Sequence, residues 1–219
     1  MKFKTIIFDL DGTIIDTTSI WRQATKDLIT LHGADYNQEL ENFLNKALKG
    51  VATEGACKII KDACNISEPV ERLMQIKKDR ACQLYQEKLT FINGFTEFHK
   101  KLSLKNLKNA IATNSDVETL NIVKDKLNLK NFFGDHIYSK ADVNYQSKPD
   151  PAIFLHTAKN LNTDPKECIV IEDSACGVEA AKKAGMYCIG INTDNNRKNT
   201  QEADMTIDFY EEINLDILL

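Results

Sequence analysis

One stretch decides the fold of this chain: Thr5-Ile6-Ile7-Phe8-Asp9-Leu10-Asp11-Gly12-Thr13. It opens as a short apolar run rich in β-branched residues, which is typical of a strand buried on both faces. It then breaks into a glycine turn that carries two carboxylates two positions apart. Because strand side chains alternate with a period of two, Asp9 and Asp11 can face the same pocket. Aspartate and glycine are also ordinary turn residues, so the meaning of the pair depends on the rest of the chain.

Five further runs of the same kind recur, each bounded by turn or cap residues. They are Asn109–Thr113, His136–Tyr138, Cys168–Glu172, Tyr187–Ile191 and Met205–Ile207. Helical segments are predicted between the later runs, at Gly94–Ser103, Asp116–Leu127, Pro151–Leu161 and Cys176–Ala184. This alternation predicts an α/β fold, a Rossmann-like doubly wound parallel sheet whose ligands bind at the carboxyl ends of the strands.

The stretch from about residue 16 to residue 91 interrupts that alternation with helical periodicity. Its apolar stripes are Ile20, Ala24, Leu28 and Leu31 in one segment, and Leu73, Ile76, Lys77, Arg80 and Leu84 in another. We therefore expect a Rossmann-like core of residues 1–15 and 92–219, and a helical cap of residues 16–91 inserted after the first strand. The hinges would be Gly12–Asp16 and Ile92–Gly94.

Composition limits the classes of function. The 219 residues carry a formal net charge of −4, which does not favour nucleic acid as a partner, and no apolar stretch approaches the length of a membrane span. The N-terminal run is a buried-type strand that ends in acids rather than a secretory signal, so we expect a cytoplasmic protein, monomeric or weakly dimeric. The six cysteines show no C-x-x-C spacing, which predicts free thiols and no zinc cluster.

Three more segments place polar side chains where a strand ends or a helix begins. They are Ala112-Thr113-Asn114-Ser115, Ser147-Lys148-Pro149-Asp150-Pro151 and Ile169-Val170-Ile171-Glu172-Asp173-Ser174. A strand end that opens into a helix N-terminus suits an anion, and a lysine in rigid backbone suits a phosphate. Adjacent acids at the mouth of a buried strand need a cation, and oxygen ligands without nearby cysteine or histidine favour Mg²⁺.

Each of these segments also has an ordinary explanation. Thr113–Ser115 and Asp173 belong to residue types that cap helices, and a lysine such as Lys148 is usually solvated when it lies in a proline turn. The residues taken one segment at a time leave both explanations open.

Taken together, the four segments resemble the four motifs of the haloacid dehalogenase-like superfamily, in this order and at these separations. The residues that carry the resemblance are Asp9-Leu10-Asp11-Gly12-Thr13, Thr113-Asn114, Lys148 and Glu172-Asp173. The helical insert, the lysine-proline segment and Glu172-Asp173-Ser174-x-x-Gly177-Val178-x-Ala180-Ala181 resemble the branch of β-phosphoglucomutase and small sugar-phosphate phosphatases. The resemblance covers nearly the whole chain.

This resemblance implies a Mg²⁺-dependent phosphatase that acts on a small phosphomonoester of the sugar- or polyol-phosphate kind. Asp9 would attack phosphorus and form an aspartyl-phosphate, while Asp11 would protonate the leaving oxygen and later activate water. Mg²⁺ would bind Asp9, the backbone carbonyl of Asp11, and Asp173, with Glu172 beside it. The site for the transferring oxygens would consist of Thr113, Lys148 and the backbone at Leu10 and Asn114.

Other chemistries of the superfamily fit less well. Its dehalogenases lack the second aspartate of the first motif, which is present here as Asp11. Its mutases carry a histidine in the first cap helix and an arginine in a cap loop, where this chain has Trp21 and Thr53, although Lys49-Gly50 matches that loop. Its phosphonate-cleaving members use a cap lysine as a Schiff base, and Lys49 or Lys46 is the candidate here. A binding module without turnover is the remaining alternative, and the charged residues of the motifs count against it.

The cap would select the substrate, and its sequence does not name one. We expect Trp21 and Lys49 to lie near the opening between cap and core. Trp21 would either stack on a sugar or fill the seam between the domains, and packing is the commoner role of an aromatic side chain.

Overall fold

The computed structural model describes residues 3–48, 51, 53–194 and 196–218. Contacts between residues divide the chain into two compact units. One, called the core unit below, comprises the chain up to Thr18 and from Leu89 onward, and the other, called the helical unit, comprises Ser19–Lys88. The boundaries expected from the sequence fall after residues 15 and 91, and those of the contact units fall after residues 18 and 88.

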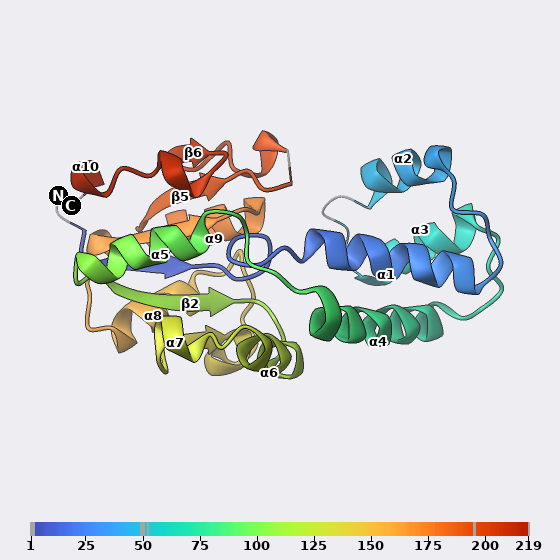
Figure 1. Cartoon of the computed structure of the whole chain (residues 1–219), viewed down its shortest axis with the longest axis horizontal. Helices are drawn as coiled ribbons and strands as arrows, with labels where there is room; N and C mark the ends of the chain where they lie inside the picture. Colours follow the sequence, from blue (N-terminus) through green and yellow to red (C-terminus); the bar gives the residue numbers. More distant parts are fainter. Residues whose placement is uncertain (1–2, 49–50, 52, 195, 219) are drawn as a thin grey trace. The chain divides into compact units, whose positions relative to one another are not determined.

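The core unit is built on a parallel sheet of six strands (Figure 1). The strands are β1 (Thr5–Phe8), β2 (Lys108–Thr113), β3 (Ile137–Ser139), β4 (Cys168–Glu172), β5 (Tyr187–Ile191) and β6 (Met205–Ile207). Their order is β3-β2-β1-β4-β5-β6, so the first strand of the chain lies in the middle of the sheet. Phe8 at the end of β1 pairs with Ile111 of β2 and with Ile171 of β4. The prediction of a Rossmann-like doubly wound sheet is confirmed.

Helices cover both faces of this sheet (Figure 1). They are α5 (Phe95–Leu104), α6 (Val117–Lys126), α7 (Lys130–Phe133), α8 (Ala152–Asn160), α9 (Ala175–Lys183) and the short α10 (Leu215–Leu218), with 3₁₀ turns at Lys140–Val143, Pro165–Glu167, Arg197–Asn199 and Tyr210–Glu212. Successive residues of β1 show the alternation: Ile7 packs with Phe154 of α8 and Val178 of α9, whereas the ring of Phe8 lies edge-on to Phe95 of α5 at 5.8 Å. Both faces of the strand are therefore buried, which explains its continuous apolar run.

The helical unit is formed by α1 (Thr18–Leu31), α2 (Gln38–Ala47), α3 (Thr53–Ala63) and α4 (Val70–Lys88), the first residue of α1 being counted with the core unit. Its own apolar cluster includes Leu28, Leu44, Ile60 and Leu73. An ion pair of 2.6 Å between Arg80 Nε and Asp27 Oδ2 joins α4 to α1. One residue of the predicted stripe is misplaced, because Leu31 ends α1 and is 68% exposed.

Two predictions from composition can be compared with the structure. All six cysteines are free thiols, as predicted. Among the described residues, no helix has the length and apolar character needed to cross a membrane.

Candidate active site

The first acid of the opening motif lies directly after the central strand. The backbone N–H of Asp9 donates to the carbonyl of Ile171 at 2.9 Å, so the pairing of β1 with β4 continues for one more residue. This bond places Asp9 beside Glu172, the last residue of β4. The side chain of Asp9 is buried, with 6% of the residue exposed. The chain then turns through Gly12, whose φ of 86° lies in the left-handed region that glycine adopts without strain.

Lys148 joins the acids of two strands. Its Nζ lies 2.5 Å from Asp9 Oδ1 and 2.8 Å from Glu172 Oε1. Its backbone N–H donates to Oδ1 of Asn114 at 3.0 Å, which fixes the lysine loop to the segment that follows β2. The side chain is buried, and the ring centroid of Phe154 is 4.7 Å from the ammonium. A solvated lysine in a proline turn is therefore excluded, and three of the predicted segments meet at this cation.

The charges at this point do not balance. Burial raises the pKa of Asp9 to about 7; Lys148 works against that rise, and the neighbouring acids Glu172 and Asp11 add to it. Burial alone would lower the pKa of Lys148, but the charges of Asp9 and Glu172 raise it instead. A single ammonium thus lies among several carboxylates, so binding of a further cation would be favourable here.

Asp11 is held from the other side by hydroxyl groups that follow β2. Thr113 Oγ1 lies 3.3 Å from Asp11 Oδ2, and the hydroxyl of Ser115 donates to the same oxygen. The backbone N–H of Ser115 in turn donates to Thr113 Oγ1 at 3.0 Å. Ser115 was not predicted as a site residue, although it belongs to the polar segment Thr113-Asn114-Ser115 that the sequence singles out. Its bond to Asp11 joins positions more than a hundred residues apart, so no local pattern reveals it.

Asp173 lies against the glycine turn. Thr13 Oγ1 is 3.2 Å from Asp173 Oδ1, and a Cβ placed on Gly12 would overlap the Asp173 carboxylate. Glycine is thus required both by φ and by this close approach. Burial raises the pKa of Asp173, and the charges of Glu172 and Asp9 raise it further. Asp173 does not cap the following helix, because the N-cap of α9 is Ser174.

Two residues missed by the sequence interpretation hold the backbone of this turn. The hydroxyl of Thr193 donates to the carbonyl of Gly12 at 2.6 Å, and the buried hydroxyl of Tyr210 donates to the carbonyl of Thr13 at 3.0 Å. Both come from the C-terminal part of the chain. No signal near either residue connects it with the first motif.

Glu172 uses both of its oxygens within the protein. Oε1 receives the Lys148 ammonium, and Oε2 accepts the backbone N–H of Ser174 at 2.8 Å and its hydroxyl at 2.9 Å. Gly177 of α9 lies so close that a Cβ there would overlap the Glu172 carboxylate. Through these contacts Glu172 holds Lys148 and the end of β4 in place.

The donor set can be compared with the needs of Mg²⁺. No group of three His, Cys, Asp or Glu side chains within the described ranges is close enough to hold a metal by itself. Asp9 and Asp173 nevertheless provide two carboxylates, and the backbone carbonyl of Asp11 would be a third oxygen ligand. Hard oxygen donors and raised carboxyl pKa values fit a small divalent cation that retains water ligands.

The other predicted residues have the following positions. Leu10 is fully buried, so its side chain packs within the core and does not face a ligand. Trp21 lies in α1 of the helical unit, where Lys77 Nζ is 5.7 Å from its ring centroid. Lys49 lies outside the described residues.

Comparisons with known proteins place the chain in a family. The family model described as haloacid dehalogenase-like hydrolase matches residues 6–191. A phosphorylated carbohydrates phosphatase of Thermotoga maritima is 29% identical, with 83% of this chain and 81% of that protein covered. Hexitol phosphatase B of Escherichia coli K12 is 30% identical, with 84% and 81% covered. The crystal structure of a putative β-phosphoglucomutase from Thermotoga maritima is 27% identical, covers 100% of this chain and 98% of its own, and gives a TM-score of 0.82.

Proposed function

Because the chain belongs to the haloacid dehalogenase-like hydrolase family, we propose that it is a Mg²⁺-dependent phosphatase of a small phosphorylated sugar or polyol. The observation that carries this proposal is Lys148, buried between Asp9 and Glu172 with Asp11 and Asp173 nearby. A purely structural site has no need for so many acids around one cation, whereas transfer of a phosphoryl group uses each of them.

Asp9 is the nucleophile of the proposed reaction. One of its carboxylate oxygens forms a bond to phosphorus while the bond from phosphorus to the ester oxygen breaks, which leaves an aspartyl-phosphate. Lys148 already lies 2.5 Å from Asp9 Oδ1, so its charge is in place to steady the carboxylate and the transferring oxygens. The backbone at Leu10 and Asn114, with Thr113, would complete the phosphate site.

Asp11 is the proton carrier. It gives a proton to the departing alcohol oxygen and takes one back from the water that attacks the aspartyl-phosphate, so each turnover releases alcohol and inorganic phosphate. Thr113 and Ser115 would orient its Oδ2 during both steps. The position of Asp11 two residues beyond the nucleophile, on the same turn, supports this role.

Mg²⁺ held by Asp9, Asp173 and the carbonyl of Asp11 would reduce the repulsion between the attacking carboxylate and the phosphate dianion. Glu172 would act through Lys148 and Ser174, since both of its oxygens are already bound within the protein. The turn that presents Asp9 and Asp11 is kept in shape by Thr13, Thr193 and Tyr210.

Relatives suggest the substrate class and one alternative. Two of them are named as phosphatases of phosphorylated carbohydrates and of hexitols, which supports a sugar or polyol phosphate here. A third is named as a putative β-phosphoglucomutase, so a phosphosugar mutase is the second candidate. Trp21 and Thr53, where mutases of the family carry histidine and arginine, favour hydrolysis.

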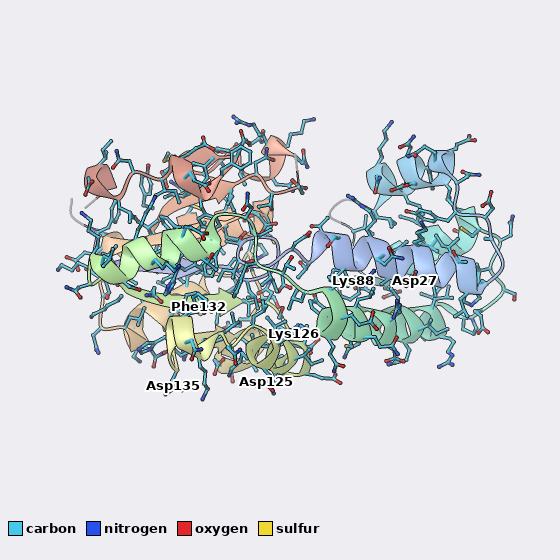
Figure 2. The ribbon with its side chains drawn as sticks, in the orientation of Figure 1. Asp27, Lys88, Asp125, Lys126, Phe132 and Asp135 are labelled. Atoms are coloured by element: carbon cyan, nitrogen blue, oxygen red, sulfur yellow. The ribbon has the colours of Figure 1, made fainter. Side chains whose placement is uncertain are left out.

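The test is release of phosphate from p-nitrophenyl phosphate, followed by a panel of sugar and polyol phosphates. We expect turnover that stops with EDTA, returns with added Mg²⁺ and is abolished in Asp9→Asn. Asp125→Asn is the matched control, because Asp125 is an exposed aspartate on α6 (Figure 2). Zero turnover on the whole panel with Mg²⁺ still bound would make the chain a binding module. Conversion of glucose 1-phosphate to the 6-phosphate, with a bisphosphate activator, would make it a mutase.

A further inference from the structure

A hollow lies at the start of strand β2 in the core unit, at the other end of that strand from Thr113. Its volume is about 430 Å³, within the range of roughly 300–1,000 Å³ that is usual for small-molecule sites. It is lined by residues from three places: Leu107–Asn109 at the start of β2, Phe132, Phe133 and His136 around α7, and Asn160–Asn162 at the end of α8.

This hollow is separate from the candidate active site. Lys108 is the first residue of β2 and Thr113, which contacts Asp11, is the last. Five residue steps along a strand span about 16 Å. No residue of the hollow belongs to the site around Asp9, so the phosphatase proposal does not account for it.

The lining has a charge opposite to that of the chain. The whole chain has a net charge of −4, yet the lining contains Lys108 and His136 and no carboxylate. Lys108 Nζ donates to the carbonyl of Leu161 at 2.6 Å and to that of Asn162 at 3.5 Å, and it forms no ion pair with any described acid. The nearest acid in sequence to His136 is Asp135, which pairs with Lys130 at 3.4 Å. An ammonium has three donors, so Lys108 can still bind an anion.

Further polar groups of the lining are available for hydrogen bonds. Asn109 Oδ1 is 3.4 Å from His99 Nε2, and the Asn109 amide nitrogen has no acceptor among the described residues. His136 Nδ1 is 3.2 Å from the Tyr138 hydroxyl, which leaves Nε2 without a described partner. Lys108, Asn109 and His136 therefore provide donors for the two oxygens of a carboxylate.

The remaining wall is apolar and aromatic. Phe132, on α7 (Figure 2), is half-buried and packs edge-on against His99 at 5.1 Å, and the neighbouring Phe133 is buried. Leu107 and Leu161 complete this surface. A flat ring in the ligand would cover the exposed part of Phe132 while its charge reaches Lys108.

We propose that this hollow is a binding site for a small aromatic carboxylate, separate from the active site. The carboxylate binds Lys108, with Asn109 and His136 as further donors, and the ring lies against Phe132.

The probe for this site is 2-naphthoate, added to the full ¹⁵N-labelled chain and followed by amide NMR shifts. We expect saturable shifts at residues 107–109, 132–136 and 160–162, with the turn at Asp9–Thr13 unmoved. The uncharged 2-naphthamide and the variant Lys108→Met should each weaken binding by about tenfold or more, as expected for the loss of a charge-assisted bond. Lys101→Met, an exposed lysine on α5, is the control and should bind like the parent.

Lys108→Met also loses the bond to Leu161, so its fold must be checked by the same spectra. If its shifts outside the hollow change, His136→Ala takes its place and should also weaken binding, because His136 is exposed and its removal gives up the contact with Tyr138 rather than a buried bond. Shifts that fail to saturate by about 10 mM, equal affinity for naphthoate and naphthamide, or shifts confined to the turn at Asp9–Thr13 would each overturn the proposal.

Discussion

Among the described residues, each of the two units of this protein buries one lysine, and the two lysines have opposite surroundings. Lys148 of the core unit and Lys77 of the helical unit are both 6% exposed. Lys148 lies between two carboxylates, whereas Lys77 forms no ion pair with a described acid and has the Trp21 ring 5.7 Å away. The pKa values move accordingly: burial lowers that of Lys77, while Asp9 and Glu172 overcome burial and raise that of Lys148.

The comparison teaches that burial by itself does not define the role of a charged side chain. In the core unit the cation completes a set of acids, and the proposed phosphoryl transfer would use that set. In the helical unit the ammonium is desolvated without compensation from an acid, which disfavours folding. The substitutions below separate these two situations, beginning with the largest expected effect.

Lys148→Met should reduce turnover by a factor of at least about 10²–10³, the usual loss for one fixed charge at a transition state. It should also lower the free energy of unfolding by about 3–5 kcal/mol, because breaking a buried ion pair leaves its acids uncompensated. Phosphate release and urea denaturation measure the two effects. Glu172→Gln, which leaves Asp9 as a partner of Lys148, should destabilise the protein less. An unchanged unfolding midpoint in Lys148→Met would remove the distinction between the two lysines.

Lys77→Met should act in the opposite direction. It removes a desolvated charge and keeps an unbranched chain of similar length, so we expect a gain of about 0.5–2 kcal/mol in the free energy of unfolding. The measurement is urea denaturation at pH 7. Lys88→Met is the matched control on the same helix, because Lys88 is exposed (Figure 2) and its loss should change stability by no more than about 0.5 kcal/mol. A clear loss of stability in Lys77→Met would show that the ammonium has a favourable partner.

The advantage of Lys77→Met should shrink in alkali. The pKa of Lys77 in the folded chain lies below its ordinary value of 10.5. At pH values between the folded-state pKa and 10.5, the folded state therefore binds fewer protons than the unfolded state. The free energy of unfolding of the parent therefore rises with pH across this window. The variant has no ammonium at this position, so its stability does not gain in the same way. Denaturation of both proteins between about pH 8 and pH 10.5 measures the difference. A difference that stays constant with pH would contradict the assignment.

Much of the sheet can be predicted from the sequence, because buried parallel strands are continuous apolar runs. The strands β4, β5 and β6 have the predicted ends. β2 begins one residue earlier than predicted, at Lys108. The backbone of this charged, exposed residue still pairs with Thr5 of β1. β3 begins one residue later, at Ile137, since a run of three residues gives little pattern to fix its ends.

The sequence predicts those residues of the candidate site that belong to short motifs. Asp9, Asp11 and the two acids at the end of β4 lie at strand ends, and parallel strands bring such ends to one edge. Lys148 reaches them from the loop that precedes α8. The supports of the site are different: Ser115, Thr193 and Tyr210 act through single hydrogen bonds to distant residues, and such bonds leave no periodic signal. Lys77 illustrates the same limit, because helical periodicity placed it in an apolar stripe without indicating what surrounds its charge.

The two connections to the helical unit lie side by side where they leave the sheet. Ile15 pairs with Phe91, Ile92 N–H donates to Ile14 at 2.8 Å, and Asp16 N–H donates to Thr90 at 3.2 Å. The outgoing and returning strands of chain are thus fastened together before the insert begins. An insertion point closed in this way can accept helices of another length or sequence without disturbing the turn that holds Asp9. Evolution, or an engineer, can exchange the inserted helices while the turn that holds Asp9 stays the same.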